Sequence, residues 1–150
     1  MARAARPQAV LFACGMNAVR SPMAAALFKY YFGRTYVSSA GVRKGELDPF
    51  AVAAMDELGL DITKHKPMTI EELEDWEGLN FDLIITLSPE AHHKALELTR
   101  TVAADVEYWP TPDPTPTEGS REQRLEAYRA VRDQLSRRIR ERFTEKVGNE

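Results

Sequence analysis

A cysteine and an arginine six positions apart are the residues of this sequence whose types and spacing could do chemistry. Five residues separate Cys14 from Arg20, and Ser21-Pro22 follows directly. A segment of that length can curl into a loop whose backbone N–H groups point at one tetrahedral anion. The spacing therefore predicts a phosphate-binding loop, whose members are Gly15, Met16, Asn17, Ala18, Val19 and Arg20.

This loop is suited to nucleophilic chemistry. Its N–H groups and the helix start predicted at Ser21-Pro22 stabilise negative charge, so we expect Cys14 to be an ionised, reactive thiolate. The guanidinium of Arg20 offers a planar fork to two oxygens of a bound phosphate. The hydroxyl of Ser21 can donate a hydrogen bond to the sulfur as it attacks and as it leaves. A buried structural cysteine would explain Cys14 alone, but it leaves the positions of Arg20 and Ser21 without a reason.

Four short apolar or β-branched runs predict the strands that hold this loop in place. They cover residues 9–13, 36–39, 82–87 and 106–109. The helical spacing of apolar residues predicts five helices. Three of them cover residues 49–58, 69–76 and 121–143, and the other two begin at Ser21-Pro22 and at Pro89. Strands with little polar alternation, separated by helices, favour a parallel sheet with helices on both faces.

We therefore predict an α/β fold, built on one small, doubly wound, four-stranded parallel sheet of order 2-1-3-4. Residues 1–150 are expected to form a single domain, because the Pro-rich stretch 110–117 lies directly between a strand and a helix. Thr69 and Glu72 have the spacing of a capping box at a helix start. Ligands of such sheets bind beyond the carboxyl ends of the strands, and Cys14 closes the first predicted strand.

Composition and charge narrow the class of protein. The chain has 150 residues, 43% of them hydrophobic, and a single cysteine, which excludes a disulfide within the chain and a multi-cysteine zinc site. Residues 1–43 carry six basic side chains and no carboxylate although the net charge is −3, which favours an anionic ligand in this part. No basic stripe with interleaved aromatics is present, and no apolar run approaches roughly 18 residues. We therefore expect neither a nucleic-acid nor a membrane partner.

The apolar stretch in front of Cys14 covers only residues 9–13. A secretory signal peptide needs an apolar segment of about 7–15 residues, so a buried strand explains this stretch better. An unpaired thiol on such a strand predicts a reducing, cytoplasmic location.

At these positions the sequence resembles the low-molecular-weight protein tyrosine phosphatases and their relatives, which include some arsenate reductases. The family pattern is Cys-x-Gly-Asn-x-Cys-Arg-Ser-Pro after an N-terminal strand, with an Asp-Pro acid loop late in the chain. The matching residues here are Cys14, Asn17, Arg20, Ser21, Pro22, Asp113 and Pro114. The resemblance implies that Asp113 is the general acid. It also implies that Ser21, Ser39 and His65 brace Asn17.

The chain departs from the family pattern at four places. Met16 stands where the family has the loop glycine, so either the backbone adjusts or Gly15 takes the demanding torsion. Val19 replaces the second cysteine, which removes the disulfide that family members can form. The loop after Gly41 and the residues Thr115-Pro116 lack the aromatics that flank an aryl group in the family.

Three other aromatic residues could line the entrance of the site, with core packing as the alternative role. They are Trp76, Tyr108 and Trp109.

Together these residues predict a two-step, cysteine-dependent hydrolysis of phosphomonoesters. The thiolate of Cys14 attacks phosphorus while Asp113 protonates the leaving oxygen, and Asp113 then acts as base on the water that cleaves the phosphocysteine. The expected substrate is a phosphotyrosine protein or a small phosphomonoester, and inorganic phosphate or sulfate should bind the same loop. We expect no cofactor and no metal, because the loop itself supplies positive charge.

Two alternatives stay open. Arsenate fits the same loop, and a single-cysteine arsenate reductase would need an external low-molecular-weight thiol, because the sequence has no second cysteine. A non-catalytic module that binds phospho-ligands is the second alternative, prompted by Met16 and the missing aromatics. Assays of aryl phosphate turnover and arsenate reduction distinguish the three functions.

Overall fold

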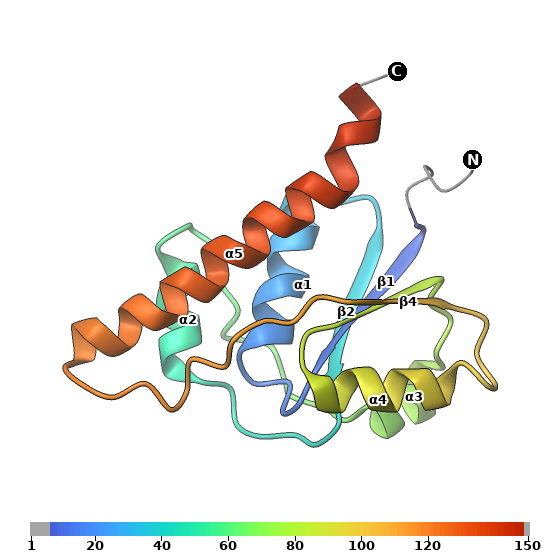
Figure 1. Ribbon diagram of the computed structural model, residues 1–150, viewed down its shortest axis with the longest axis horizontal. Coiled ribbons are helices and arrows are strands. Elements are labelled where there is room, and N and C mark those ends of the chain that lie inside the picture. The colour runs from blue at the N-terminus through green and yellow to red at the C-terminus, as the bar shows by residue number, and fades with distance from the viewer. Residues whose placement is uncertain (1–6, 149–150) are drawn as a thin grey trace.

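Four parallel strands form the centre of the computed structural model, which describes residues 7–148 (Figure 1). They are β1 (Ala9–Cys14), β2 (Tyr36–Gly41), β3 (Leu83–Thr86) and β4 (Asp105–Tyr108), in the order β2-β1-β3-β4. All three strand pairings are parallel, and Cys14 pairs with Gly41 at the carboxyl edge of the sheet. The predicted fold class and strand order are confirmed. Arg3 and Arg6, two of the basic residues counted above, lie outside the described residues.

Helices cover both faces of this sheet (Figure 1). Side chains alternate between the faces along a strand, so β1 contributes Val10 and Phe12 to one core and Leu11 and Ala13 to the other. The first core is closed by α1 (Arg20–Tyr31), α2 (Pro49–Asp56) and α5 (Arg121–Gly148). The second is closed by α3 (Ile70–Glu77) and α4 (Pro89–Leu98). None of the described helices is long and apolar enough to cross a bilayer.

Polar caps start the helices where the sequence predicts. The Asp48 carboxylate accepts a hydrogen bond from the N–H of Phe50 at the start of α2, with Pro49 in the first turn. Thr69 and Glu72 form the predicted capping box in front of α3. In contrast, α1 begins after Val19, which provides no side-chain cap, and its first turn holds no acidic residue. The N-terminus of α1 is therefore the one beside Cys14 that can stabilise an anion.

Strand β2 and helix α5 extend by two or more residues beyond their predicted ends. Strand β2 continues to Gly41 because its last residues pair with the end of β1, and α5 continues to Gly148. The apolar side chains of α5 are buried as expected from their spacing; they include Leu125, Tyr128, Val131, Leu135, Ile139 and Phe143.

An ion-pair cluster fastens α5 to the end of α2. Glu57 accepts hydrogen bonds from Arg129 and Arg132, which lower the pKa of this carboxyl to about 2. Arg132 also donates to the carbonyl oxygen of Ala54 at 2.7 Å. These contacts set the position of the first half of α5, whose side chains reach the carboxyl edge of the sheet.

Candidate active site

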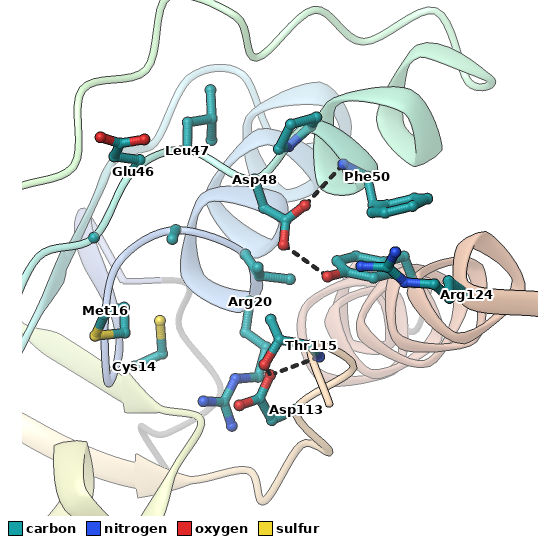
Figure 2. Close-up of a pocket in the computed structure, with 15 residues that line it drawn as sticks. Cys14, Met16, Arg20, Glu46, Leu47, Asp48, Phe50, Asp113, Thr115 and Arg124 are labelled. Atoms are coloured by element: carbon teal, nitrogen blue, oxygen red, sulfur yellow. Dashed lines mark hydrogen bonds between the residues drawn. The ribbon is translucent and has the colours of Figure 1, made fainter. Parts of the chain in front are cut away.

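The loop between β1 and α1 lies against the segment 42–48, which follows β2 (Figure 2). Backbone carbonyl oxygens of the loop accept hydrogen bonds from N–H groups of that segment. The pairs are Cys14 with Val42 (3.1 Å), Gly15 with Arg43 (2.8 Å), Met16 with Gly45 (3.0 Å) and Ala18 with Asp48 (3.2 Å). In a trans peptide the N–H points opposite to the carbonyl, and no described peptide bond is cis. The N–H groups that follow these carbonyls therefore point away from the segment.

These N–H groups are unused within the described chain. None of the backbone N–H groups of residues 15–19 donates a hydrogen bond to another residue between 7 and 148. A run of successive unpaired N–H donors next to a helix N-terminus is an anion-binding arrangement. The structure thus places donors for an oxyanion beside the thiol of Cys14.

Asn17 holds the loop in this shape from inside. It is fully buried and has φ of 55°, the one non-glycine residue among those described with a positive φ. Its side-chain amide donates to Ser21 Oγ (2.9 Å) and Ser39 Oγ (3.0 Å), and its Oδ1 accepts from the N–H of Met68 (2.9 Å). His65 Nε2 donates to the backbone carbonyl oxygen of Asn17 (3.1 Å). These contacts stabilise a left-handed backbone that side chains otherwise rarely adopt.

Of the two alternatives for Met16, the one in which Gly15 takes the demanding torsion is wrong. Neither Gly15 nor Met16 has a positive φ, and the left-handed residue is Asn17. Asparagine is enriched in this conformation, and here its amide is bonded on every side. The backbone accommodates Met16 without strain, and the Met16 side chain lies over Gly45 at the pocket wall.

Gly41 is a residue that sequence reasoning missed. A Cβ at this position would lie 2.8 Å from the backbone nitrogen of Asn17 and 2.4 Å from the carbonyl oxygen of Arg43. Only glycine allows the end of β2 to approach the loop this closely. The signal available in the sequence was a glycine at the end of a predicted strand.

The thiol of Cys14 contacts one hydroxyl. Its Sγ lies 3.0 Å from Ser21 Oγ, and both side chains are buried. A serine hydroxyl has one hydrogen and two lone pairs. Because Ser21 already accepts from Asn17, its hydrogen is available to the sulfur. The contact therefore suits a thiolate that receives a hydrogen bond.

Arg20 and Asp113 are brought together by a contact between distant parts of the chain. Arg20 Nη1 donates to the carbonyl oxygen of Thr111 at 3.0 Å, which fixes the start of the loop that carries Asp113. One carboxylate oxygen of Asp113 accepts from the N–H (3.0 Å) and the hydroxyl (2.8 Å) of Thr115. The other oxygen has no partner among the described residues. Asp113 lines the same pocket as Cys14 and Arg20 (Figure 2).

The pocket in front of the thiol has a volume of about 630 Å³. Its aromatic side chains come from elements outside the motif. The rings of Phe50 and Tyr128 stack at 5.3 Å, and both line the pocket. The Tyr128 hydroxyl donates to Asp48 at 2.6 Å, and burial together with this carboxylate raises the pKa of Tyr128 well above its ordinary value. Aromatic side chains are therefore present in the pocket although the two loops lack them.

The three aromatics considered for the entrance do not line this pocket. Trp109 is buried in the core against Phe12, and Tyr108 stacks on His92. Trp76 is 81% exposed on α3, which covers the other face of the sheet. Among the described residues, no group of three or more His, Cys, Asp or Glu is placed to hold a metal ion.

The pH dependence of stability tests the contact between His65 and Asn17. Burial lowers the pKa of His65, and the hydrogen bond to Asn17 only partly opposes this. Above about pH 6.5 the imidazole of His65 is unprotonated in both the folded and the unfolded state, so it does not change the free energy of unfolding with pH. As the pH falls from that value towards the folded pKa, the unfolded chain takes up the proton first, so the free energy of unfolding decreases.

We expect the variant His65→Gln, which keeps an N–H donor, to lose less stability than the wild-type protein between about pH 7.5 and about pH 5. Urea unfolding at the two pH values measures this difference. His93→Gln is the matched control, because the His93 side chain is 82% exposed. If wild type and His65→Gln lose the same stability on acidification, the assigned state of His65 is wrong.

A thiol, free amide donors and an arginine at the carboxyl edge of a doubly wound sheet are typical of the class of cysteine-based enzymes that act on an oxyanion. Comparison with known proteins agrees with this class. The family model described as low molecular weight phosphotyrosine protein phosphatase matches residues 9–150, and the chain belongs to that family. It is 34% identical over 134 residues to the arsenate reductase of Bacillus subtilis, covering 88% of this chain and 92% of that protein.

Two solved structures share the fold. The low molecular weight protein tyrosine phosphatase from T. tengcongensis has a TM-score of 0.73 and 26% identity, and the match covers 93% of this chain and 99% of that one. An arsenate reductase in its phosphate-binding state has a TM-score of 0.69 and 27% identity, and the match covers 92% of this chain and 98% of that one. Relatives of this chain thus carry the names of two activities.

Proposed function

We propose that this protein is a phosphomonoester hydrolase that works through a phosphocysteine on Cys14, in the manner of a protein tyrosine phosphatase. The observation that carries the proposal is the set of unpaired N–H donors at residues 15–19 beside Cys14 Sγ. These donors and Arg20 bind the equatorial oxygens of the phosphoryl group and stabilise the charge of the transition state. The unpaired thiol also fits a cytoplasmic location.

In the first step the Cys14 thiolate attacks phosphorus in line with the leaving oxygen. The S–P bond forms, the P–O bond breaks, and its electron pair goes to the leaving oxygen, which takes a proton from Asp113. Asp113 is a protonated carboxylic acid in this step, and the proton is on the oxygen that Thr115 does not hold. The hydroxyl of Ser21 stabilises the sulfur in its anionic form.

In the second step water cleaves the phosphocysteine. Asp113 takes a proton from the water, the new O–P bond forms, and the S–P electron pair returns to Cys14 as a thiolate. The products are inorganic phosphate and the regenerated enzyme. Phosphate and sulfate should therefore bind the loop and inhibit competitively.

The pocket wall supports an aromatic leaving group, as in phosphotyrosine or another aryl phosphate. Phe50, Tyr128, Leu47 and Met16 present apolar surface along the pocket. A volume of about 630 Å³ lies in the range of ligand pockets for small organic molecules, roughly 300–1,000 Å³. An aryl ring in this space would replace water on apolar side chains, which favours its binding.

Arsenate reduction is the second candidate, favoured by the names of relatives such as the one from Bacillus subtilis. In that reaction the Cys14 thiolate would displace a hydroxyl of arsenate, and an external thiol would attack the sulfur. The S–As electron pair would pass to arsenic, which leaves as arsenite, and a second thiol would reduce the mixed disulfide. Both thiols must be external, because the sequence has no cysteine besides Cys14.

Parallel assays of the full chain test the proposal. We expect release of p-nitrophenol from p-nitrophenyl phosphate without added thiol, and no arsenite from arsenate with or without glutathione. Arsenite formation that exceeds phosphate ester turnover would replace the phosphatase proposal by arsenate reduction. Phosphate binding without either turnover would indicate a non-catalytic module.

A further inference from the structure

Arg124 of α5 lies across the pocket from Cys14 (Figure 2). Its side chain is partly buried, and its guanidinium carbon lies 4.6 Å from the centre of the Phe50 ring. Between residues 7 and 148 its guanidinium group forms no ion pair and donates no hydrogen bond. The five N–H donors of this guanidinium therefore remain available at the pocket.

Three other arginines of the same helix bind carboxylates, whereas Arg121 does not. Arg129 and Arg132 hold Glu57, and Arg142 holds Glu107 at 2.6 Å. Arg121 lies over the Phe50 ring at 5.7 Å and also lacks a carboxylate partner in the described chain. Two guanidinium groups without counter-charges in contact thus lie over the Phe50 ring, and that of Arg124 lines the pocket.

The carboxylates that line the pocket are not in contact with Arg124. Asp48 accepts from Tyr128 and from the N–H of Phe50, and Asp113 accepts from Thr115. Glu46 stands across the pocket on the segment 42–48 (Figure 2). None of the three forms an ion pair with Arg124 within 4.0 Å. A guanidinium in this position favours an anionic group on a bound ligand.

We propose that the substrate carries a second anionic group, which Arg124 binds while the scissile phosphate occupies the loop around Cys14. This inference rests on the proposed phosphatase function and specifies its substrate class: an aryl phosphate with a carboxylate or further phosphate at its other end. The aromatic part lies along Phe50 and Tyr128, between the two charged ends. An acidic side chain next to phosphotyrosine and a small acidic aryl phosphate share this chemistry.

Two matched substrate pairs test the proposal, and they distinguish a phosphotyrosine peptide from a small aryl phosphate as the carrier of the second anionic group. The small pair is 3-(4-phosphonooxyphenyl)propanoate and its neutral amide, and the peptide pair has Glu or Gln beside phosphotyrosine. We expect the wild-type protein to prefer the acidic member of at least one pair by about tenfold in kcat/KM, as expected for a hydrogen-bonded, partly buried charge pair. The pair that shows the preference identifies which of the two kinds of substrate the pocket accepts.

The variant Arg124→Gln is expected to lose this preference, so that kcat/KM is about the same for the acidic and the neutral substrate of a pair. The change should lie mainly in KM, because Arg124 is across the pocket from the reacting sulfur. Arg124→Lys keeps the charge but not the planar fork, and it should retain part of the preference. Arg138→Gln is the matched control: Arg138 lies on the same helix over Trp109 and does not line the pocket. Higher salt should weaken the preference of the wild-type protein.

Equal kcat/KM within both pairs, or a preference that Arg124→Gln keeps, would overturn the inference. A binding measurement separates it from the phosphatase proposal. Calorimetry with the corresponding aryl phosphonates, acid against amide, reports on Arg124 without any turnover. If the acid binds more tightly than the amide but no phosphate ester is hydrolysed, the Arg124 subsite is supported and the proposed phosphatase activity is refuted. If esters are hydrolysed but acid and amide are not distinguished, the phosphatase activity is supported and the Arg124 subsite is refuted.

Discussion

Replacing Cys14 by serine is expected to abolish the hydrolysis of p-nitrophenyl phosphate, with a loss of more than about 10⁴-fold in kcat. The unpaired N–H groups of residues 15–19 and the hydroxyl of Ser21 stabilise an anionic sulfur. Asp113 acts as the acid in the first step, so a serine hydroxyl would lack a general base to activate it. His65 cannot take this role, because its Nε2 donates to the backbone carbonyl of Asn17. The serine variant would therefore keep the anion-binding loop without an effective nucleophile.

The control for this variant is phosphate binding. Cys14→Ser should bind inorganic phosphate with an affinity close to that of the wild-type protein, measured by calorimetry, because the loop donors and Arg20 are unaltered. In the wild-type protein, phosphate should slow the alkylation of Cys14 by iodoacetate. Hydrolysis by Cys14→Ser within tenfold of wild type would refute the assignment of the nucleophile.

Replacing Asp113 by asparagine is expected to slow hydrolysis by about 10²–10⁴-fold, the usual contribution of a positioned general acid. Asparagine can still accept the hydrogen bonds from Thr115, so the loop should keep its shape while losing the transferable proton. Asp113 acts in both steps, so both formation and cleavage of the phosphocysteine should be slower. Rapid-quench measurement of phosphoenzyme and released phenol resolves the two steps.

Glu118→Gln is the matched control for Asp113→Asn. Glu118 is an exposed carboxylate five positions further along, outside the pocket lining. We expect its turnover to equal that of the wild-type protein. If Asp113→Asn also retains wild-type turnover, the acid is another group, and the proximity of Asp113 to Cys14 has no catalytic meaning.

Features that depend on neighbouring residues were predictable from the sequence. The loop between Cys14 and Arg20, the capping box at Thr69 and the buried face of α5 each follow from spacing within one segment. The four-stranded parallel sheet followed from alternating apolar strands and helices, because only a few topologies satisfy such a pattern. Strand ends were less accurate, since β2 continues to Gly41 through pairing with β1.

Features that depend on distant residues were decided by the tertiary structure alone. Tyr128 reaches Asp48 across 80 positions, and Arg20 reaches Thr111 across 91. The family resemblance implied that Ser39 and His65 brace Asn17, but it indicated neither the contact from Met68 nor the positive φ of Asn17.

The composition of the pocket is the clearest case of this division. Motif positions predicted the end of the pocket that holds Cys14, because a cysteine, its loop and an arginine are contiguous in the chain. Phe50, Tyr128 and Arg124 read in the sequence as parts of amphipathic helices, where an aromatic or an arginine has an ordinary packing or surface role. They face the thiol only because α2 and α5 pack at the carboxyl edge of the sheet, and helix packing depends on side chains from both partners.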